Sequence, residues 1–346
     1  MRTGVFHETF ASEERLWDSP TARQWMAAFT IALFTLPFWS SDYLLAMACI
    51  VGIHVIATLG LNLTTGNAGL ISLAHGAFLG VGCYTVAWLA RHGVPFYLAL
   101  PAAGLLAAAL GLVVGLPSLR VKGIYLAVAT LAAHFILTFV FREWESVTGG
   151  VPGTQIPRAN LFGFEFKGDH RNFYLIFVPA FLLALAARNL ARTHIGRALV
   201  AVRDRDFSAE ILGVNLLRTK LLAFAVGAFY AGVAGGLLGY FYGAISPEYF
   251  TLTLSVFYLA AVIVGGLGTV LGSILGALFM TFVPEALRLV AHVSTQWFPG
   301  AASLLLPMGQ VVFGVLIIVF LVFEPHGLAA IWARVRRVFH LWPFKT

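Results

Sequence analysis

Apolar residues occupy long runs of the chain, and charged residues stand almost only between these runs. Each run has about 15–25 residues, the length that an α-helix needs to cross a hydrocarbon layer of roughly 30 Å. The strands of a transmembrane barrel would alternate apolar and polar residues, and the sequence lacks that alternation. The pattern predicts an all-α, polytopic transmembrane helix bundle of about ten spans. We expect them near 25–40, 43–61, 68–90, 97–117, 123–141, 173–187, 221–242, 251–265, 270–290 and 309–323.

Composition and charge support this class. The chain is 60% hydrophobic and 11% charged, whereas soluble domains carry roughly 25% charged residues. Most of the 22 Lys and Arg residues fall in segments that share one side if the N-terminus is cytoplasmic. This bias sets the orientation of membrane proteins, so we expect both termini in the cytoplasm. Because the basic residues flank spans, the net charge of +7 does not indicate a nucleic-acid partner.

The spacing of the charges divides the chain into three parts. A polar, amphipathic arm occupies 1–23, and it lacks the basic start and the cleavage site of a signal peptide. A transmembrane domain follows over 24–325, with a long outer loop at 142–172 and a long basic cytoplasmic loop at 188–220. A basic cytoplasmic tail is expected at 326–346. Long loops in compact proteins are often functional, although the alternative for the inner one is a solvated connector.

The sequence lacks the motifs of energy-coupling chemistry. It has no phosphate-binding loop, no His-Glu-x-x-His zinc motif and no Gly-x-Ser-x-Gly elbow. No predicted span carries a carboxylate at mid-depth, and Glu285 with Arg288 lies toward one end of its span. Ion-coupled transporters usually keep ionisable groups inside the membrane. We therefore expect no catalytic residue, metal site or cofactor in this chain, and an energy source in a partner.

Polar residues cluster where the second predicted span meets the third. Such groups must find hydrogen-bond partners or border a watery cavity. One interpretation is a broken helix beside the translocation path, and the other is a set of interhelical hydrogen bonds that hold the bundle together. The sequence does not separate the two. The candidate path residues are Asn62, Thr65, Asn67, Ser72 and His75.

Glycines four residues apart recur in the predicted spans. Small residues at this spacing share one helix face and let two helix backbones approach closely in lipid. We predict helix packing as their role, and they indicate nothing about the substrate. The set is Gly76, Gly80, Gly232, Gly236, Gly268, Gly272 and Gly276.

Two short glycine-rich segments echo each other. Gly-Asn-Ala-Gly at 66–69 is followed by Gly-Ala-Phe at 76–78, and Gly-Gly-Leu-Gly at 265–268 by Gly-Ala-Leu at 276–278. Internal repeats of this kind are common in transporters.

Several of these segments resemble the LivH/LivM-type permeases of ABC importers for branched-chain amino acids. The first, Gly60 to Phe78, departs only in Ala74-His75-Gly76, where the family usually has Gly-His-Ala. The second runs from Gly196 to Phe224, and the third from Gly265 to Gly276. Thr148-Gly149-Gly150 with Ile156-Pro157 matches the LivM branch. Together they span about 45–325 in the family's order.

The resemblance implies a permease subunit in the bacterial inner membrane. Its expected partners are two cytoplasmic ABC ATPase subunits, which would carry ATP and Mg, a second, LivH-type permease, and a substrate-binding protein outside the membrane. The expected solutes are branched-chain amino acids or similar small polar molecules. The alternatives are urea and short amides within the same family, a self-sufficient secondary transporter or channel, and a membrane-embedded enzyme.

The resemblance also assigns a role to the cytoplasmic loop. His194 to Asn215 matches the permease helix that docks in a groove of the ATPase. Arg203-Asp204-Arg205-Asp206 divides two helical stretches, and we expect a turn there with salt bridges to the partner. The alternative is a helix that lies on the membrane surface. The expected coupling residues are Gly196, Arg197, Arg203, Asp204, Ala209, Glu210, Leu212 and Gly213.

Overall fold

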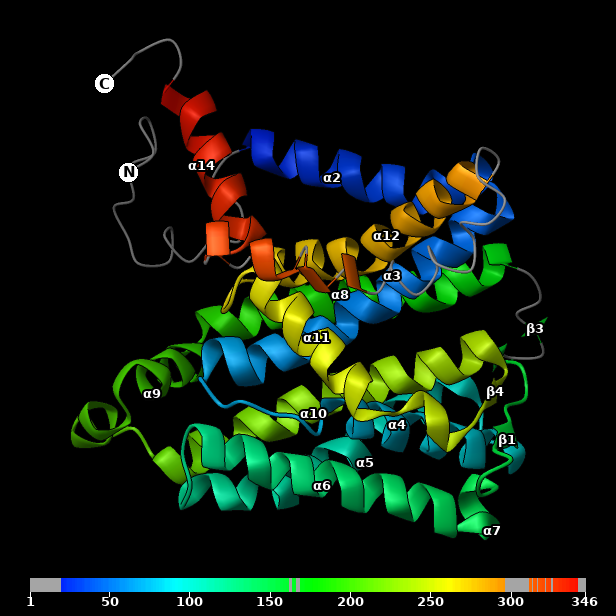
Figure 1. Ribbon diagram of the computed structural model, residues 1–346, viewed down its shortest axis with the longest axis horizontal. Helices are drawn as coiled ribbons and strands as arrows, with labels where there is room; N and C mark the ends of the chain where they lie inside the picture. Colours follow the sequence, from blue (N-terminus) through cyan, green and yellow to red (C-terminus); the bar gives the residue numbers. More distant parts are fainter. Residues whose placement is uncertain are drawn as a thin grey trace.

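The computed structural model describes residues 20–161, 164–165, 169–295 and 311–341, apart from 313, 316, 321 and 325. The described chain is a helical bundle whose long helices run roughly side by side (Figure 1). The predicted all-helical class is confirmed. Most of the predicted arm at 1–23 lies outside the described residues.

The described residues form twelve labelled α-helices. They are α2 (Pro20–Thr35), α3 (Asp42–Leu61), α4 (His75–Arg91), α5 (Phe96–Gly115), α6 (Ile124–Glu143), α7 (Glu145–Thr148), α8 (Asp169–Arg192), α9 (His194–Ile211), α10 (Leu216–Tyr242), α11 (Leu252–Gly265), α12 (Val270–Thr295) and α14 (Leu328–Leu341). A π-helical turn, η2 (Asn62–Asn67), extends α3, and short 3-10 turns are η1 (Leu36–Phe38), η3 (Leu116–Leu119) and η4 (Pro247–Tyr249).

Within the described residues, seven helical segments are long and apolar enough to cross a membrane. The helices α2 and α4 have 16 and 17 residues and are shorter than this group. The predicted span at 309–323 falls partly outside the described residues. The seven segments are Asp42–Asn67, Phe96–Ser118, Ile124–Glu143, His170–Arg192, Leu216–Tyr242, Pro247–Gly265 and Val270–Leu289.

The centre of the bundle is formed by α10 and α3. The apolar windows of these two helices are 72% and 67% buried, against 28–39% for the other candidate spans. The helix α10 packs on α3, α4 and α5. Its glycines permit this, because a Cβ at Gly235 would collide with the backbone of Leu79 on α4. The outer helices leave many large apolar side chains exposed, as lipid-facing helices do.

The third predicted span begins later than expected. The sequence predicts a helix from 68, but residues 68–74 form an irregular connection and α4 begins at His75. Gly69 there has a φ of +70°, a left-handed conformation that ends helical geometry. The chain is therefore broken between α3 and α4, inside the bundle.

The predicted outer loop carries small elements of its own. Strand β1 (Thr154–Gln155) pairs antiparallel with β4 (Ala244–Ile245), which follows α10. Strands β2 (Asn160–Leu161) and β3 (Phe164–Glu165) form a separate antiparallel pair. Figure 1 shows α7, β1 and β4 at one end of the bundle and α9 at the other.

Candidate coupling and translocation site

The helix α9 is divided by a kink at Arg205. The backbone there has φ −155° and ψ 97°, which is extended rather than helical. The hydroxyl of Thr193 accepts a hydrogen bond from the Gly196 backbone at the start of the helix, and Gly213 follows its end with a φ of +90°. Glycine is favoured there because side chains rarely adopt this conformation. The result is a helix–kink–helix element outside the candidate spans, protruding in Figure 1.

The second half of α9 exposes an apolar tip. Phe207, Ile211 and Leu212 are 73%, 71% and 83% exposed. Exposed apolar groups outside the candidate spans typically mark an interaction surface. Of these three residues, only Leu212 is among the predicted coupling residues. We define the apolar tip as Phe207, Ile211 and Leu212.

The other predicted coupling residues differ in their burial and contacts. Gly196 and Ala209 are buried, and a Cβ at Gly196 would meet backbone oxygens at the end of α8. The guanidinium of Arg197 donates to the backbone oxygen of Arg192 over 3.0 Å. Asp204 and Glu210 are exposed.

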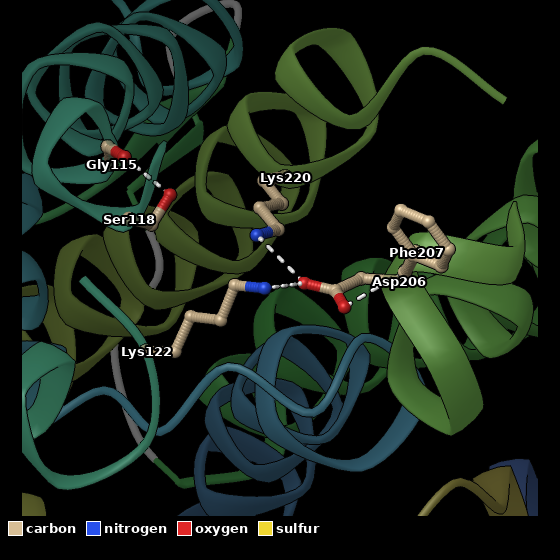
Figure 2. A network of polar contacts seen from close by, with 6 residues as sticks. All are labelled: Gly115, Ser118, Lys122, Asp206, Phe207 and Lys220. Atoms are coloured by element: carbon tan, nitrogen blue, oxygen red, sulfur yellow. Dashed lines mark hydrogen bonds and ion pairs between the residues drawn. The ribbon is translucent and has the colours of Figure 1, made fainter. Parts of the chain in front are cut away.

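Asp206 joins α9 to two other elements. Its carboxylate lies 2.5 Å from the Lys122 ammonium before α6 and 3.7 Å from that of Lys220 on α10 (Figure 2). Lys220 is buried, with 4% exposure. The hydrogen bond from Lys122, aided by both positive charges, lowers the pKa of Asp206. Asp206, the last residue of the 203–206 run, thus forms two ion pairs within the chain.

Arg203 reaches from α9 into the break between α3 and α4. Its guanidinium donates to the backbone oxygen of Gly66, in η2, over 2.5 Å. The same group lies beside Gly268, in the turn between α11 and α12. Its aliphatic stem lies against Gly69, where a Cβ would be 3.1 Å from Cγ of Arg203. One side chain of α9 therefore touches both glycine-rich segments that echo each other in the sequence.

Asn62 connects the same two segments inside the bundle. Its amide nitrogen donates to the Thr269 backbone oxygen over 2.8 Å and to the Ser273 hydroxyl over 2.7 Å. Its amide oxygen accepts from the Gly268 backbone nitrogen over 2.8 Å. Asn62 is 3% exposed, so these bonds are made away from water. We call the segments 62–74 and 265–269 the paired breaks.

The remaining predicted path residues are also buried. The Thr65 hydroxyl donates to the Leu70 backbone oxygen over 3.1 Å, and the His75 ring nitrogen Nε2 donates to that of Ala57 over 2.8 Å. Asn67 is 6% exposed. The hydroxyl of Ser72 has no hydrogen-bond partner within the described chain. Asn62, Thr65 and His75 thus make hydrogen bonds within the fold. The Ser72 hydroxyl remains free to bind another group.

The glycines assigned to packing divide into two groups. Six lie on helices, and their added Cβ atoms would meet neighbouring atoms: Gly76, Gly80, Gly232, Gly236, Gly272 and Gly276. Gly268 differs from this assignment, because it lies in the α11–α12 turn with a φ of +78°. Its conformation and its closeness to Arg203, rather than helix packing, require glycine there.

Four residues of the site were not predicted from the sequence, namely Lys122, Lys220, Thr269 and Ser273, and Asp206 was predicted only as part of the 203–206 run. A signal for Lys220 is present, because it opens an apolar span with a charge. For the partners of Asn62, the one sequence signal is the similarity between the segments 66–69 and 265–268. Their contact depends on how α3, α11 and α12 pack, which no local pattern encodes.

A cavity of about 490 Å³ opens at the other end of α3 and α12. The hydroxyl of Tyr43 donates to the Glu285 carboxylate over 2.5 Å, and Arg288 lies 3.3 Å from that carboxylate. Its remaining walls are apolar, including Met47 and Phe282. The described residues hold no group of three or more His, Cys, Asp or Glu suited to a metal ion.

Comparison with known proteins gives consistent matches over most of the chain. A family described as branched-chain amino acid transport system / permease component matches residues 43–321. The high-affinity branched-chain amino acid transport system permease protein LivM of Escherichia coli K12 is 36% identical over 78% of this chain and 70% of its own length. LivH of the same system in Salmonella typhimurium is 30% identical over 70% of this chain and 84% of its own. No solved structure matches.

Proposed function

The chain belongs to the family of branched-chain amino acid transport permeases, and we propose that its helix α9 couples an ATPase to the paired breaks within the bundle. It is a multi-pass membrane protein and the permease component of an ABC transport system, a transport subunit rather than a catalytic one. What remains to be proposed is how it is assembled and how it is driven.

The proposed assembly contains a second permease of the LivH type, two cytoplasmic ATPases that bind ATP and Mg, and a binding protein outside the membrane. Relatives named LivM and LivH from high-affinity branched-chain amino acid transport systems both match this chain, which supports a paired permease. The proposed topology has ten spans, with α2, α4 and the segment at 309–323 added to the seven long helices. Both termini and α9 then lie in the cytoplasm, which agrees with the charge bias.

The ATPase would hold the permease by the apolar tip of α9. A short helix with exposed apolar side chains fits a groove on a partner, as amphipathic helices do in other complexes. The exposed charges of Asp204 and Glu210 stand beside the tip and would set its orientation. One side of α9 packs on the permease, because Gly196, Leu199, Val202 and Ala209 are buried.

Movement of α9 would reach the membrane domain through two contacts. Asp206 holds α9 to the starts of α6 and α10 through its ion pairs with Lys122 and Lys220. Arg203 holds it to Gly66, and Asn62 carries that connection to the turn at Gly268. Interfaces of this kind switch between discrete packings rather than bending continuously. We propose that the paired breaks separate or close as α9 moves, which opens the path on one side at a time.

Solute would pass beside the segment 62–74. Irregular backbone at membrane depth is tolerated where protein or a water-filled cavity surrounds it. The unused hydroxyl of Ser72 and the neighbouring Asn67 are the polar groups that we propose to face solute when the breaks separate. Asn62, Thr65 and His75 would then serve mainly to hold the closed packing.

The observation that carries the proposal is the hydrogen bond from Arg203 to Gly66. In Arg203→Gln, we expect assembly with the ATPases to persist, because the apolar tip is intact. Substrate-stimulated ATP hydrolysis and solute moved per ATP should fall, by roughly tenfold for the loss of a charged hydrogen bond. Both are measured on the complete complex in proteoliposomes.

Two further variants make the result decisive. Arg203→Lys keeps a donor and should recover part of the transport per ATP, whereas the exposed Arg218→Gln should behave as wild type. If Arg203→Gln keeps wild-type transport per ATP, the connection through Gly66 is wrong. Transport without ATP by the isolated chain would instead favour a self-sufficient transporter or channel.

A further inference from the structure

The last described helix, α14, has two unlike faces. Leu328, Ile331, Trp332 and Val335 recur at helical spacing, so they share one face. Arg334, Arg336 and Arg337 lie off that face. The segment Leu328–Leu341 contains no Asp or Glu. A helix with Trp and aliphatic residues on one face and arginines elsewhere is typical of helices that lie in a membrane interface.

The described residues cover the apolar face of α14 only in part, because Leu328 and Ile331 are half-buried. Trp332 and Val335 are 55% and 41% exposed. Its start packs closely on the bundle, because a Cβ on Gly327, just before the helix, would lie 2.6 Å from the Gly266 backbone nitrogen, and one on Gly266 would lie 3.1 Å from Cβ of Ala329. A helix whose start is fixed and whose apolar face is open requires another surface to cover that face.

An ion pair with the segment just before it fixes the direction of α14. Arg334 makes two contacts with the Glu324 carboxylate, at 3.2 and 3.4 Å. The Glu324 side chain is 15% exposed, so the pair is shielded on one side. Figure 1 shows α14 running across the direction of the long helices, at the end of the bundle where α9 lies. A helix across the ends of the spans runs along the membrane surface rather than through it.

We infer that α14 lies in the lipid interface on the α9 side, with its apolar face among the acyl chains and Arg336 and Arg337 on anionic headgroups. The occupant is a negatively charged lipid surface because the charge is complementary and the helix lies at the end of the spans. Each basic side chain near such a surface strengthens the attraction, and long arginine stems let their charges reach the headgroups. Trp332 suits the boundary, where its ring is half apolar and half polar.

This contact would bear on transport because of where α14 begins. The start of α14 packs against Gly265 and Gly266, which lie at the turn between α11 and α12. In that α11–α12 turn, the Gly268 backbone nitrogen donates to Asn62. Lipid that holds α14 therefore holds one of the paired breaks. The lipid contact itself rests only on α14 and stands whether or not α9 couples to an ATPase.

The test places an environment-sensitive fluorophore on Val335→Cys in the full-length chain, purified with its partner subunits. The native Cys49 and Cys83 are buried and serve as the unlabelled background. The complex is placed in nanodiscs of phosphatidylcholine alone or with about 30% phosphatidylglycerol, at low and high salt. Quenching by nitroxide-labelled lipid reports contact with acyl chains, and quenching by iodide reports contact with water.

We expect several-fold stronger lipid quenching with phosphatidylglycerol than without it, and a loss of this difference at about 0.5 M salt, where charges are screened within a few ångströms. Arg336→Gln with Arg337→Gln should abolish the difference. The matched control, Arg120→Gln with Arg218→Gln, removes two exposed charges elsewhere and should retain it.

Three results would overturn the inference. Equal lipid quenching in both nanodiscs would show that the headgroup charge is irrelevant. Protection from both lipid and iodide would show that protein covers the face. Equal effects of the two double variants would show that overall charge, and not α14, is responsible. The salt series on the unsubstituted arginines decides the matter if a double variant fails to assemble.

Discussion

Two charged residues only three positions apart act on different parts of the molecule. Arg203 donates a hydrogen bond to Gly66, and Asp206, beyond the kink at Arg205, binds Lys122 before α6 and Lys220 on α10. A continuous helix would direct residues three apart to the same face. The kink therefore lets one short run of charges serve two contacts. The buried Lys220 depends most on this arrangement, since its side chain is 5% exposed and its ammonium lies 3.7 Å from the Asp206 carboxylate.

Asp206→Asn tests this dependence. Removing the carboxylate leaves the Lys220 charge buried without its partner, which costs roughly 3 kcal/mol. Lys122→Met, which removes the partner that is 68% exposed, should cost less than about 1 kcal/mol. Thermal unfolding of the detergent-solubilised complex compares the two variants. Equal destabilisation would contradict the role assigned to the buried lysine.

The pH dependence has a definite sign. The pKa of Asp206 is lowered in the fold, so its stabilisation is present above the unfolded value of about 3.9 and is lost as pH falls through the lowered one. The difference between wild type and Asp206→Asn should thus stay constant from about pH 8 to 6. A difference that shrinks steadily over that range would place the titration on another group.

At the scale of elements, backbone contact between helices holds the centre together. Glycines let α4 and α10 cross without a layer of side chains between them, and a Cβ on Gly82 would meet the Gly232 backbone. Close backbone approach favours helix association in lipid, where apolar burial provides little drive. The same contact places the start of α4 at a fixed position relative to the paired breaks.

Gly82→Ala should therefore disturb the crossing. The added methyl meets backbone rather than a side chain that can turn away, so we expect a loss of about 1–3 kcal/mol. The control is Gly314→Ala, where no described atom lies within 4 Å of the added Cβ. Fluorescence-detected size-exclusion after heating measures both variants. A Gly82→Ala protein as heat-stable as the control would exclude the close crossing.

At the scale of the whole molecule, the two ends of the bundle differ in kind. One end carries α9, with its charges and apolar tip, and the other carries the β1–β4 pair and the loop around Gly153. Gly153 has a φ of +80° and packs on Ile245, which fixes the loop to the α10–α11 connection. An ATPase and a binding protein approaching from opposite sides would each meet a distinct surface.

The orientation can be read by cysteine accessibility in intact cells. Val151, in the β1 loop, is 62% exposed, and Arg120, between α5 and α6, is also exposed. We expect a membrane-impermeant maleimide added outside to label Val151→Cys at once and Arg120→Cys only after the membrane is permeabilised. The reverse order of labelling would invert the proposed topology.

The helical class and the approximate limits of most long helices follow from the sequence. The apolar runs are long, and hydrocarbon forces their backbones into helices. The helices α5, α6 and α11 therefore begin and end within about two residues of their predicted limits, and α10 ends at its predicted limit but begins about five residues earlier. The glycine spacing indicated close packing, and the order of motifs indicated the family. These properties are local, because they depend on solvent and on neighbours along the chain.

The tertiary structure alone decided which distant groups meet. Residues 68–74 were included in the third predicted span because they are mostly apolar, although the polar residues before them allowed a broken helix as one interpretation. The positive φ of Gly69 leaves no sign in the apolar pattern. Asn62 and Gly268 are far apart in sequence, as are Arg203 and Gly66, and each pair lies within hydrogen-bond distance. Buried polar groups must be satisfied wherever the packing puts them. The crossing of α3, α9, α11 and α12 determines which group becomes the hydrogen-bond partner. The sequence pattern indicates only that each buried polar group requires a partner.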